Sequence, residues 1–225
     1  MIRFTFVFAL YLACVVTTIA QETTPAPRPV AEPKKANQRP ANTASAAEPF
    51  DGATAKAMAE KCVKLETEAG EVEIELLPEA APEAVRNFLN LVAISFYDTT
   101  AFSRVVKSFV VQGGNLATRQ TRPPELTLRA QRTIPDEPSY VKHVRGIVSM
   151  ARPDAPNSVT TNFFILVSDS PHLDGTFTAF GRVTRGMETV DAINSAPTEN
   201  EKPLKPVRLT RALIIPCAPV EKLPN

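Results

Sequence analysis

Residues 102–115 are Phe-Ser-Arg-Val-Val-Lys-Ser-Phe-Val-Val-Gln-Gly-Gly-Asn, and the prediction of the fold starts from them. Apolar residues surround Arg104, and the run ends with the glycine pair Gly113 and Gly114. An arginine stays charged in a protein, so burying it without a partner is unfavourable. Taken alone, Arg104 is best explained as an exposed side chain beside a core strand, because charged residues mostly lie at the surface. Its interpretation therefore depends on the rest of the chain.

Three further blocks of sequence follow in order. They are Gly-Ile-Val-Ser-Met-Ala-Arg at 146–152, Asn-Phe-Phe-Ile at 162–165, and Leu-Asp-Gly at 173–175 with Phe-Gly at 180–181. Together with 102–115 they resemble the signature of the cyclophilins, which are peptidyl-prolyl cis-trans isomerases, and they look most like bacterial periplasmic members. The similarity extends from about Lys61 to Cys217. It implies a mainly β fold, a closed eight-stranded antiparallel β-barrel capped by two α-helices.

Length and composition limit the classes of protein. The 225 residues suffice for one large domain or two small ones, and the formal net charge is +1. Such a nearly neutral chain gives no sign of a nucleic-acid or membrane-surface partner. The two histidines and three cysteines show no metal-ligand spacing. We therefore expect no nucleic acid, no metal and no cofactor.

A signal peptide is predicted at residues 1–20. Arg3 supplies a positive start, 4–16 is a short apolar run, and Thr-Ile-Ala at 18–20 forms a small-residue cleavage site. The protein is therefore expected to be exported, to a periplasm or by secretion. One alternative stays open, because the residues around Cys14 weakly resemble a bacterial lipoprotein box, and lipidation there would anchor an envelope protein to the membrane.

Residues 21–50 are predicted to form a disordered linker rich in proline and alanine. Apolar periodicity is absent, so this segment cannot bury enough surface to offset the entropy of ordering it. We expect it to act as a spacer. The isomerase-like domain is assigned to 51–219, and 220–225 is a short tail.

Apolar periodicity inside the domain predicts one hairpin and two helices. Residues 63–67 and 72–76 alternate between apolar and polar side chains around a turn, which is typical of a hairpin with one buried face. An apolar stripe follows Pro82 at helical spacing, and a shorter one lies in 186–195. The other apolar runs have strand length: 101–106, 109–112, 146–151, 163–167, 177–183 and 207–215. The polar, proline-punctuated segment 117–144 is expected to form a long surface loop or short strands.

The resemblance implies that Arg104 and Gln112 are catalytic. Rotation of a prolyl amide is slow because resonance raises the barrier to about 18–20 kcal/mol. No bond has to break, so the enzyme must only bind the twisted amide more tightly than the planar forms. By resemblance, the planar, charged guanidinium of Arg104 faces the prolyl nitrogen and carbonyl. Gln112 would hold Arg104 in place and contact the substrate carbonyl.

The substrate-binding positions implied by the resemblance are mostly apolar. They are Phe102, Phe109, Val110, Ala151, Asn162, Phe164, His172, Leu173 and Phe177. Any one of these phenylalanines, taken alone, is better explained by core packing. Three positions depart from the family: Asn162 replaces a usual glutamine, Phe177 a histidine or tyrosine, and His172 a tryptophan that is common in cyclosporin-sensitive members. We therefore expect weaker inhibition by cyclosporin than a tryptophan-bearing cyclophilin shows.

The expected function is peptidyl-prolyl isomerisation that accelerates the folding of exported proteins. Unfolded or proline-containing proteins are the expected clients, and the chain is expected to be a monomer. Two alternatives stay open: an envelope chaperone or scaffold that binds proline segments with little turnover, and an anchored structural protein that works through its linker. Ser103 has no matched base, which excludes a hydrolase. His143 and His172 are not expected to catalyse, since a lone loop histidine is usually solvated.

A disulfide between Cys62 and Cys217 is expected from the resemblance. In that fold the first strand begins beside the end of the last strand, which brings the two cysteines within bonding distance. Cys14 would leave with the signal peptide, so an even number of cysteines remains. Export would also place both thiols in an oxidising compartment. The alternative is two buried free cysteines that act as small hydrophobic residues.

Overall fold

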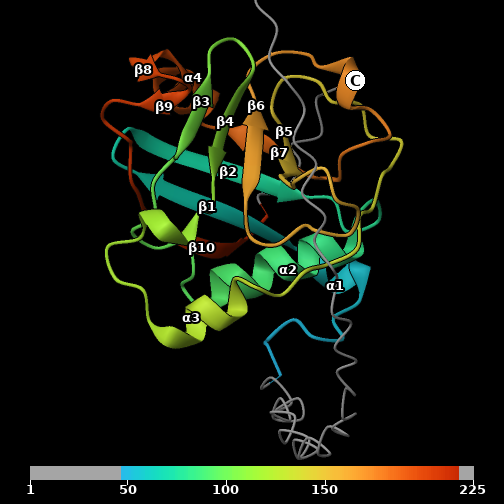
Figure 1. The fold of residues 1–225 in the computed structure, drawn as a ribbon. Coiled ribbons are helices and arrows are strands. Elements are labelled where there is room, and N and C mark those ends of the chain that lie inside the picture. The colour runs from blue at the N-terminus through green and yellow to red at the C-terminus, as the bar shows by residue number, and fades with distance from the viewer. Residues whose placement is uncertain (1–46, 218–225) are drawn as a thin grey trace, which may run out of the picture. The chain divides into compact units, whose positions relative to one another are not determined.

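The structure is a computed structural model that describes residues 47–217 (Figure 1). The predicted signal peptide 1–20 with Cys14, the linker up to residue 46 and the tail 220–225 lie outside the described residues. The last linker residues contact the domain. Phe50 packs against the main core, and Glu48 accepts a hydrogen bond from Nε of Arg129. Residues 47–50 are therefore part of the folded unit.

Eight antiparallel strands form one sheet in the order β10-β1-β2-β7-β5-β6-β4-β3 (Figure 1). Their bounds are β1 Lys61–Thr67, β2 Gly70–Leu76, β3 Arg104–Val106, β4 Val110–Gly113, β5 Ile147–Met150, β6 Phe163–Leu166, β7 Ala179–Arg185 and β10 Leu209–Pro216. The hairpin β1–β2 confirms the alternating pattern, because its apolar residues are buried and its glutamates remain at least partly exposed. A separate small hairpin consists of β8 (Thr198–Glu199) and β9 (Lys202–Pro203).

The sheet curls into a half-barrel, and its two edge strands, β3 and β10, do not pair as a ladder. The residues just before β3 instead contact the residues at the start of β10. Phe102 N donates to Val207 O at 3.0 Å, and Leu209 N donates to Thr100 O at 2.8 Å. The mainly β fold is confirmed. Instead of the expected closed barrel, the eight strands form a half-barrel, and its edges meet at the isolated bridge between Ala101 and Arg208.

Four α-helices lie within residues 47–217, where the sequence predicts two: α1 Ala55–Ala59, α2 Pro82–Ala93, α3 Pro124–Arg129 and α4 Met187–Ser195. In α2, Pro82 occupies the start of the helix, where its missing N–H does no harm, and the predicted apolar stripe is buried. The helix α3 lies in the segment expected to be loop or strand. Its six residues are too few to show an apolar period, although Pro124 and Glu125 suit a helix start.

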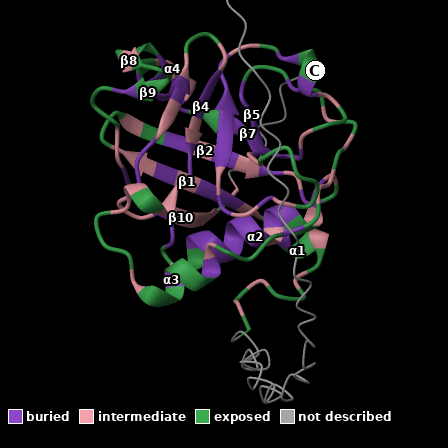
Figure 2. Cartoon of the chain, in the orientation of Figure 1, coloured by how far each residue is buried: buried purple, intermediate pink, exposed green. Residues whose placement is uncertain are grey.

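Two apolar clusters lie on opposite faces of β6. Successive side chains of a strand point to opposite faces. Phe163 therefore joins the main core, where its ring centroid lies 5.5 Å from that of Phe88 in α2. Phe164 instead joins a smaller cluster with Val110 and Leu173. Figure 2 shows the resulting burial of β6, which is covered on both faces.

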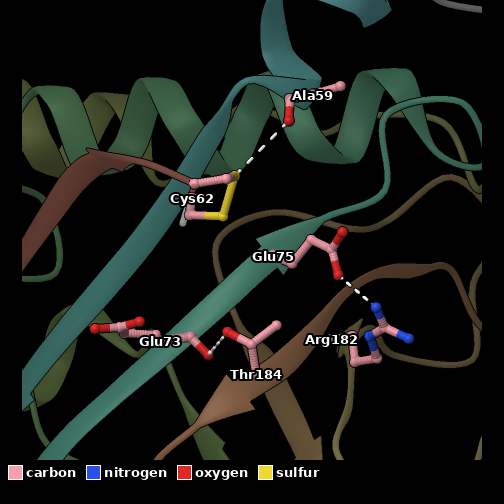
Figure 3. Close-up of a disulfide and its surroundings, with 7 residues drawn as sticks. Ala59, Cys62, Glu73, Glu75, Arg182 and Thr184 are labelled. Carbon is pink, nitrogen blue, oxygen red and sulfur yellow. Dashed lines mark hydrogen bonds and ion pairs between the residues drawn. A yellow bond between two sulfur atoms is a disulfide. The ribbon is translucent and has the colours of Figure 1, made fainter. Parts of the chain in front are cut away.

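The Sγ atoms of Cys62 and Cys217 are bonded in the structure (Figure 3). Antiparallel pairing of β1 with β10 places Lys61 opposite Pro216, so the two cysteines lie side by side with their Cα atoms 4.9 Å apart. The cysteines are 155 positions apart in sequence. The bond therefore ties the start of the domain to its end.

Candidate functional site

A cavity of about 300 Å³, called the groove below, opens beside the smaller apolar cluster on β6. The side chains around it come from β3, β4 and β6, from the residues after β5, and from the loop that precedes β7. The lining residues are Arg104, Phe109, Val110, Gln112, Ala151, Arg152, Phe164, His172, Leu173 and Phe177. The antiparallel sheet thus gathers the separate sequence blocks at one place.

Apolar and aromatic side chains form most of the groove surface. The rings of Phe164 and Phe177 lie edge to face with centroids 5.8 Å apart, and the ring of Phe109 lies 5.6 Å from that of His172. Leu173 is buried among the same residues. A concave apolar surface of this kind suits a compact apolar ring.

Arg104 supplies a positive charge to the wall of the groove. It is the first residue of β3 and lies opposite Gln112 of β4. Its side chain is 41% exposed, and its Nε donates to Oε2 of Glu201 at 2.7 Å. The sequence leads us to expect Gln112 as the support of Arg104, whereas the structure gives this hydrogen bond to Glu201. Among residues 47–217 the two Nη groups of Arg104 have no hydrogen-bond partner, so they can donate to other acceptors.

Two residues of the site escaped the sequence-based prediction. Glu201 is 97 positions from Arg104, and no local pattern links the two. Arg152 ends the block 146–152 but carries no predicted role. Its guanidinium carbon lies 5.4 Å from the ring centroid of Phe177, and its Nη1 donates to Pro153 O at 3.0 Å. Arg152 therefore adds a second cation to the lining of the groove.

Two predicted substrate-binding residues do not line the groove. Phe102 is 1% exposed and lies in the main core. The strand β3 begins only at Arg104, so strand alternation does not bring Phe102 to the same face. The amide Oδ1 of Asn162 is buried with no hydrogen-bond partner among the described residues, and its carbonyl accepts from Ala151 N at 2.9 Å. Phe102 is thus a core residue, and Asn162 contacts the groove residue Ala151 through a main-chain hydrogen bond.

Next to Leu173, the imidazole of His143 is buried between Asp174 and Ser149. Its Nδ1 lies 3.2 Å from Oδ1 of Asp174, and its Nε2 lies 3.0 Å from Oγ of Ser149. Burial lowers the pKa of His143, and Asp174 opposes that shift. Ser149 is completely buried, so this row of polar groups cannot attack a substrate. The expectation of a solvated His143 is therefore wrong, because its ring is buried. That His143 has no catalytic role stays a prediction.

Within residues 47–217, no group of three or more His, Cys, Asp or Glu side chains is arranged to hold a metal ion. The same range contains no helix with the length and apolar character needed to cross a membrane.

Comparison with known proteins identifies the family. The model of the cyclophilin type peptidyl-prolyl cis-trans isomerase/CLD family matches residues 62–214, more than half of the chain. The chain belongs to the cyclophilin family. This cyclophilin is 39% identical to peptidyl-prolyl cis-trans isomerase CYP23 of Arabidopsis thaliana over 141 residues, which are 62% of each chain. It is 35% identical to peptidyl-prolyl cis-trans isomerase A of the bacterium Dickeya dadantii over 167 residues, 68% of this chain and 84% of that one.

Solved structures agree with the family assignment. A Cryptosporidium parvum cyclophilin type peptidyl-prolyl cis-trans isomerase, solved in the presence of the dipeptide Ala-Pro, has a TM-score of 0.61 and 30% sequence identity. The match covers 68% of this cyclophilin and 98% of that chain. The enzyme class of the family is peptidyl-prolyl cis-trans isomerase. The chain spans less than two thirds of the length of the Arabidopsis relative, which therefore contains additional sequence.

Proposed function

We propose that this cyclophilin isomerises prolyl peptide bonds in exported proteins and thereby accelerates their folding. The observation that carries the proposal is the position of Arg104 in the wall of an apolar, aromatic-lined groove. Uncatalysed isomerisation takes about tens to hundreds of seconds, which is slow enough to limit folding. Proteins that fold after export would gain from its catalysis.

Arg104 is proposed to stabilise the twisted amide. As the C–N bond rotates, resonance is lost and the prolyl nitrogen regains a lone pair that accepts a hydrogen bond. Glu201 occupies Nε of Arg104, so the Nη groups remain to donate to the substrate. A donor that meets the twisted amide better than the planar one lowers the barrier, and each tenfold in rate needs only about 1.4 kcal/mol.

The apolar part of the groove is proposed to hold the prolyl ring. Phe109, Val110, Phe164 and Leu173 are the lining residues that can enclose it. Ala151 is small and leaves room for the peptide backbone, and Gln112 is placed to bind a substrate carbonyl. His172 and Phe177 complete the rim. The Ala-Pro dipeptide present with the Cryptosporidium relative supports a proline-containing ligand for this groove.

The proposed location is a periplasm or the cell exterior. The sequence of residues 1–20 has the composition of a signal peptide. The disulfide between Cys62 and Cys217 is typical of proteins from an oxidising compartment. Attachment to a membrane through a lipid on Cys14 is the alternative.

A second candidate function is a chaperone or scaffold that binds proline segments with little turnover. Asn162 favours it, because the Oδ1 atom of its amide is buried and the residue does not line the groove. Phe177 favours it as well, because it gives the rim no polar group. A groove that makes fewer hydrogen bonds to the substrate discriminates less between the twisted and the planar amide, and its catalysis is therefore weaker.

Exchange NMR with an Ala-Pro peptide separates these two candidates in one sample. We expect the purified chain to raise the rate of exchange between the cis and trans proline signals by at least about tenfold over the uncatalysed rate. A chaperone or scaffold would instead shift the peptide signals without faster exchange. Arg104→Lys is the control variant, since it keeps the charge but loses the planar fork of donors. It should retain binding and lose exchange.

A further inference from the structure

The hairpin β8–β9 carries a glutamate where its backbone favours glycine. Asn200 and Glu201 are the two residues between the strands, and both have positive φ, 48° and 64°. In such a two-residue turn Asn-Gly is the preferred pair, because glycine adopts positive φ without steric conflict. A side chain that persists in an unfavourable backbone conformation is a reason to look for its function.

Glu201 contacts β3 through both its side chain and its main chain. Its Oε2 accepts from Nε of Arg104 at 2.7 Å, and its carbonyl accepts from Val105 N at 2.8 Å. Figure 1 shows β8 and β9 close to β3, in agreement with these contacts. Because a guanidinium group is planar, a hydrogen bond that fixes Nε also limits where the two Nη groups point.

We propose that Glu201 is a positioning residue, which aims the Nη groups of Arg104 at the prolyl amide. This inference rests on the proposed isomerase function. Stability does not explain the ion pair, because the side chains of Arg104 and Glu201 are 41% and 50% exposed and exposed pairs contribute little to stability. The aim of a catalytic group, in contrast, has a strong effect on rate.

The backbone around Arg104 has a separate support. Asn194, in α4, accepts from Ser108 N through its Oδ1 at 3.0 Å and donates from its Nδ2 to Val106 O at 2.9 Å. These hydrogen bonds hold the turn between β3 and β4 without the side chain of Glu201. Loss of the carboxylate should therefore free the guanidinium of Arg104 while the strand stays in place.

The carboxylate of Glu201 also has a charge effect that opposes its positioning effect. A negative charge beside Arg104 weakens the attraction between the guanidinium and the lone pair of the prolyl nitrogen. If this charge effect dominated, removing the carboxylate would make the enzyme faster. Glu201→Gln separates the two effects, because glutamine keeps a carbonyl oxygen for Nε and loses the charge.

Three variants test the role of Glu201 in the isomerase assay. Glu201→Gly should lower kcat by at least about fivefold with KM nearly unchanged. Its melting temperature should equal or exceed that of the parent chain, since glycine suits the turn. Glu201→Gln should stay within about twofold of the parent kcat. The matched control is Glu75→Ala, which removes the exposed ion pair with Arg182 shown in Figure 3 (2.6 Å) and should leave kcat and KM unchanged.

The Nε–H signal of Arg104 in heteronuclear NMR gives a second readout that does not depend on turnover. We expect it to be sharp in the parent chain and in Glu201→Gln, and broadened by exchange with water in Glu201→Gly. A parent-like kcat or Nε–H signal in Glu201→Gly overturns the inference, as does an equal loss of kcat in Glu201→Gln. A parent chain without isomerase activity overturns the proposed function and this inference together. Activity that is insensitive to Glu201 overturns the inference alone.

Discussion

Two neighbouring phenylalanines on β6 show how the main core differs from the groove. Phe163 is completely buried against Phe88 of α2, whereas Phe164 lines the groove on the opposite face. The two side chains are chemically identical and adjacent in sequence, so residue type does not decide which of them meets a ligand. The face of the sheet decides, because the main core packs on one side of β6 and the groove opens on the other. Stability should depend mainly on the first face and catalysis on the second.

The largest expected effect is the loss of a core ring. Phe163→Ala should lower the free energy of unfolding by about 3–5 kcal/mol, because it removes a buried ring and leaves a cavity. Phe164→Ala should lower it less, since this ring borders an open groove, but should raise KM for a proline-containing peptide. Urea unfolding and isomerase kinetics of both variants provide the comparison. Equal losses of stability, or a higher KM in folded Phe163→Ala alone, would show that the two faces are not specialised.

The disulfide sharpens the same contrast, because it lies outside the groove lining. Replacing both Cys62 and Cys217 by serine should lower the free energy of unfolding by about 2–4 kcal/mol, since the bond restricts a long loop in the unfolded chain. The kcat of the folded protein should not change. Unfolding with and without a reducing agent, beside kinetics in native buffer, measures both quantities. A bond that contributed nothing to stability would leave the unfolding midpoint unchanged on reduction.

A substitution at the rim of the groove should strengthen ligand binding without changing the stability of the fold. His172 is exposed and lies beside Phe109, where a tryptophan would add aromatic surface. His172→Trp should strengthen inhibition by cyclosporin by about 0.5–1.5 kcal/mol, up to roughly tenfold in the inhibition constant. Inhibition titrations of the parent chain and the variant measure this change. Potent inhibition of the parent that His172→Trp does not improve would contradict the expected role of this position.

The smallest expected effect is the pH dependence of stability that His143 causes. Its ring lies between Ser149 of β5 and Asp174, which follows the groove residue Leu173. Burial lowers its pKa below the ordinary value of 6.5. Below that pH the unfolded chain therefore binds more protons than the folded chain, and the free energy of unfolding should fall as the pH falls. Two further charged or titratable groups lie near His143. They are Lys142, which forms an ion pair with Asp174, and His172.

Urea unfolding between about pH 7.5 and pH 5 tests this dependence. His143→Gln should flatten the dependence of the unfolding free energy on pH, because the titrating group is gone. An unchanged slope in His143→Gln would assign the pH dependence to another group.

Elements that bury one side could be predicted from the sequence. The alternation at 72–76 and the stripe of α2 each repeat with the period of their element, because one side meets the core. The helix α3 has six residues and shows no repeat, so only its proline start was visible. At the edges of the sheet, the residues just before β3 are hydrogen-bonded to Val207 and to Leu209 at the start of β10, and no local pattern reveals these bonds.

The site could be predicted where the sequence blocks matched the family and failed where side-chain direction decided the outcome. A resemblance indicates which positions correspond, but it does not give the direction of each side chain. The direction of Phe102 depends on where β3 begins, and the direction of Asn162 depends on the packing around its amide. Glu201 had no signal because a surface glutamate far along the chain does not indicate which cation it meets. Tertiary structure alone brought it to Arg104.

Arg104 is expected to act on the twisted amide and to contribute little to folding. The most direct measurement is the kcat/KM of Arg104→Ala for a proline-containing peptide, together with its free energy of unfolding. We predict that kcat/KM falls by at least about tenfold, equivalent to about 1.4 kcal/mol of lost transition-state stabilisation. The free energy of unfolding should stay within about 0.5 kcal/mol of the parent value, since the side chain is partly exposed. An Arg104→Ala chain that folds normally and retains the parent kcat/KM would show that Arg104 does not stabilise the twisted amide.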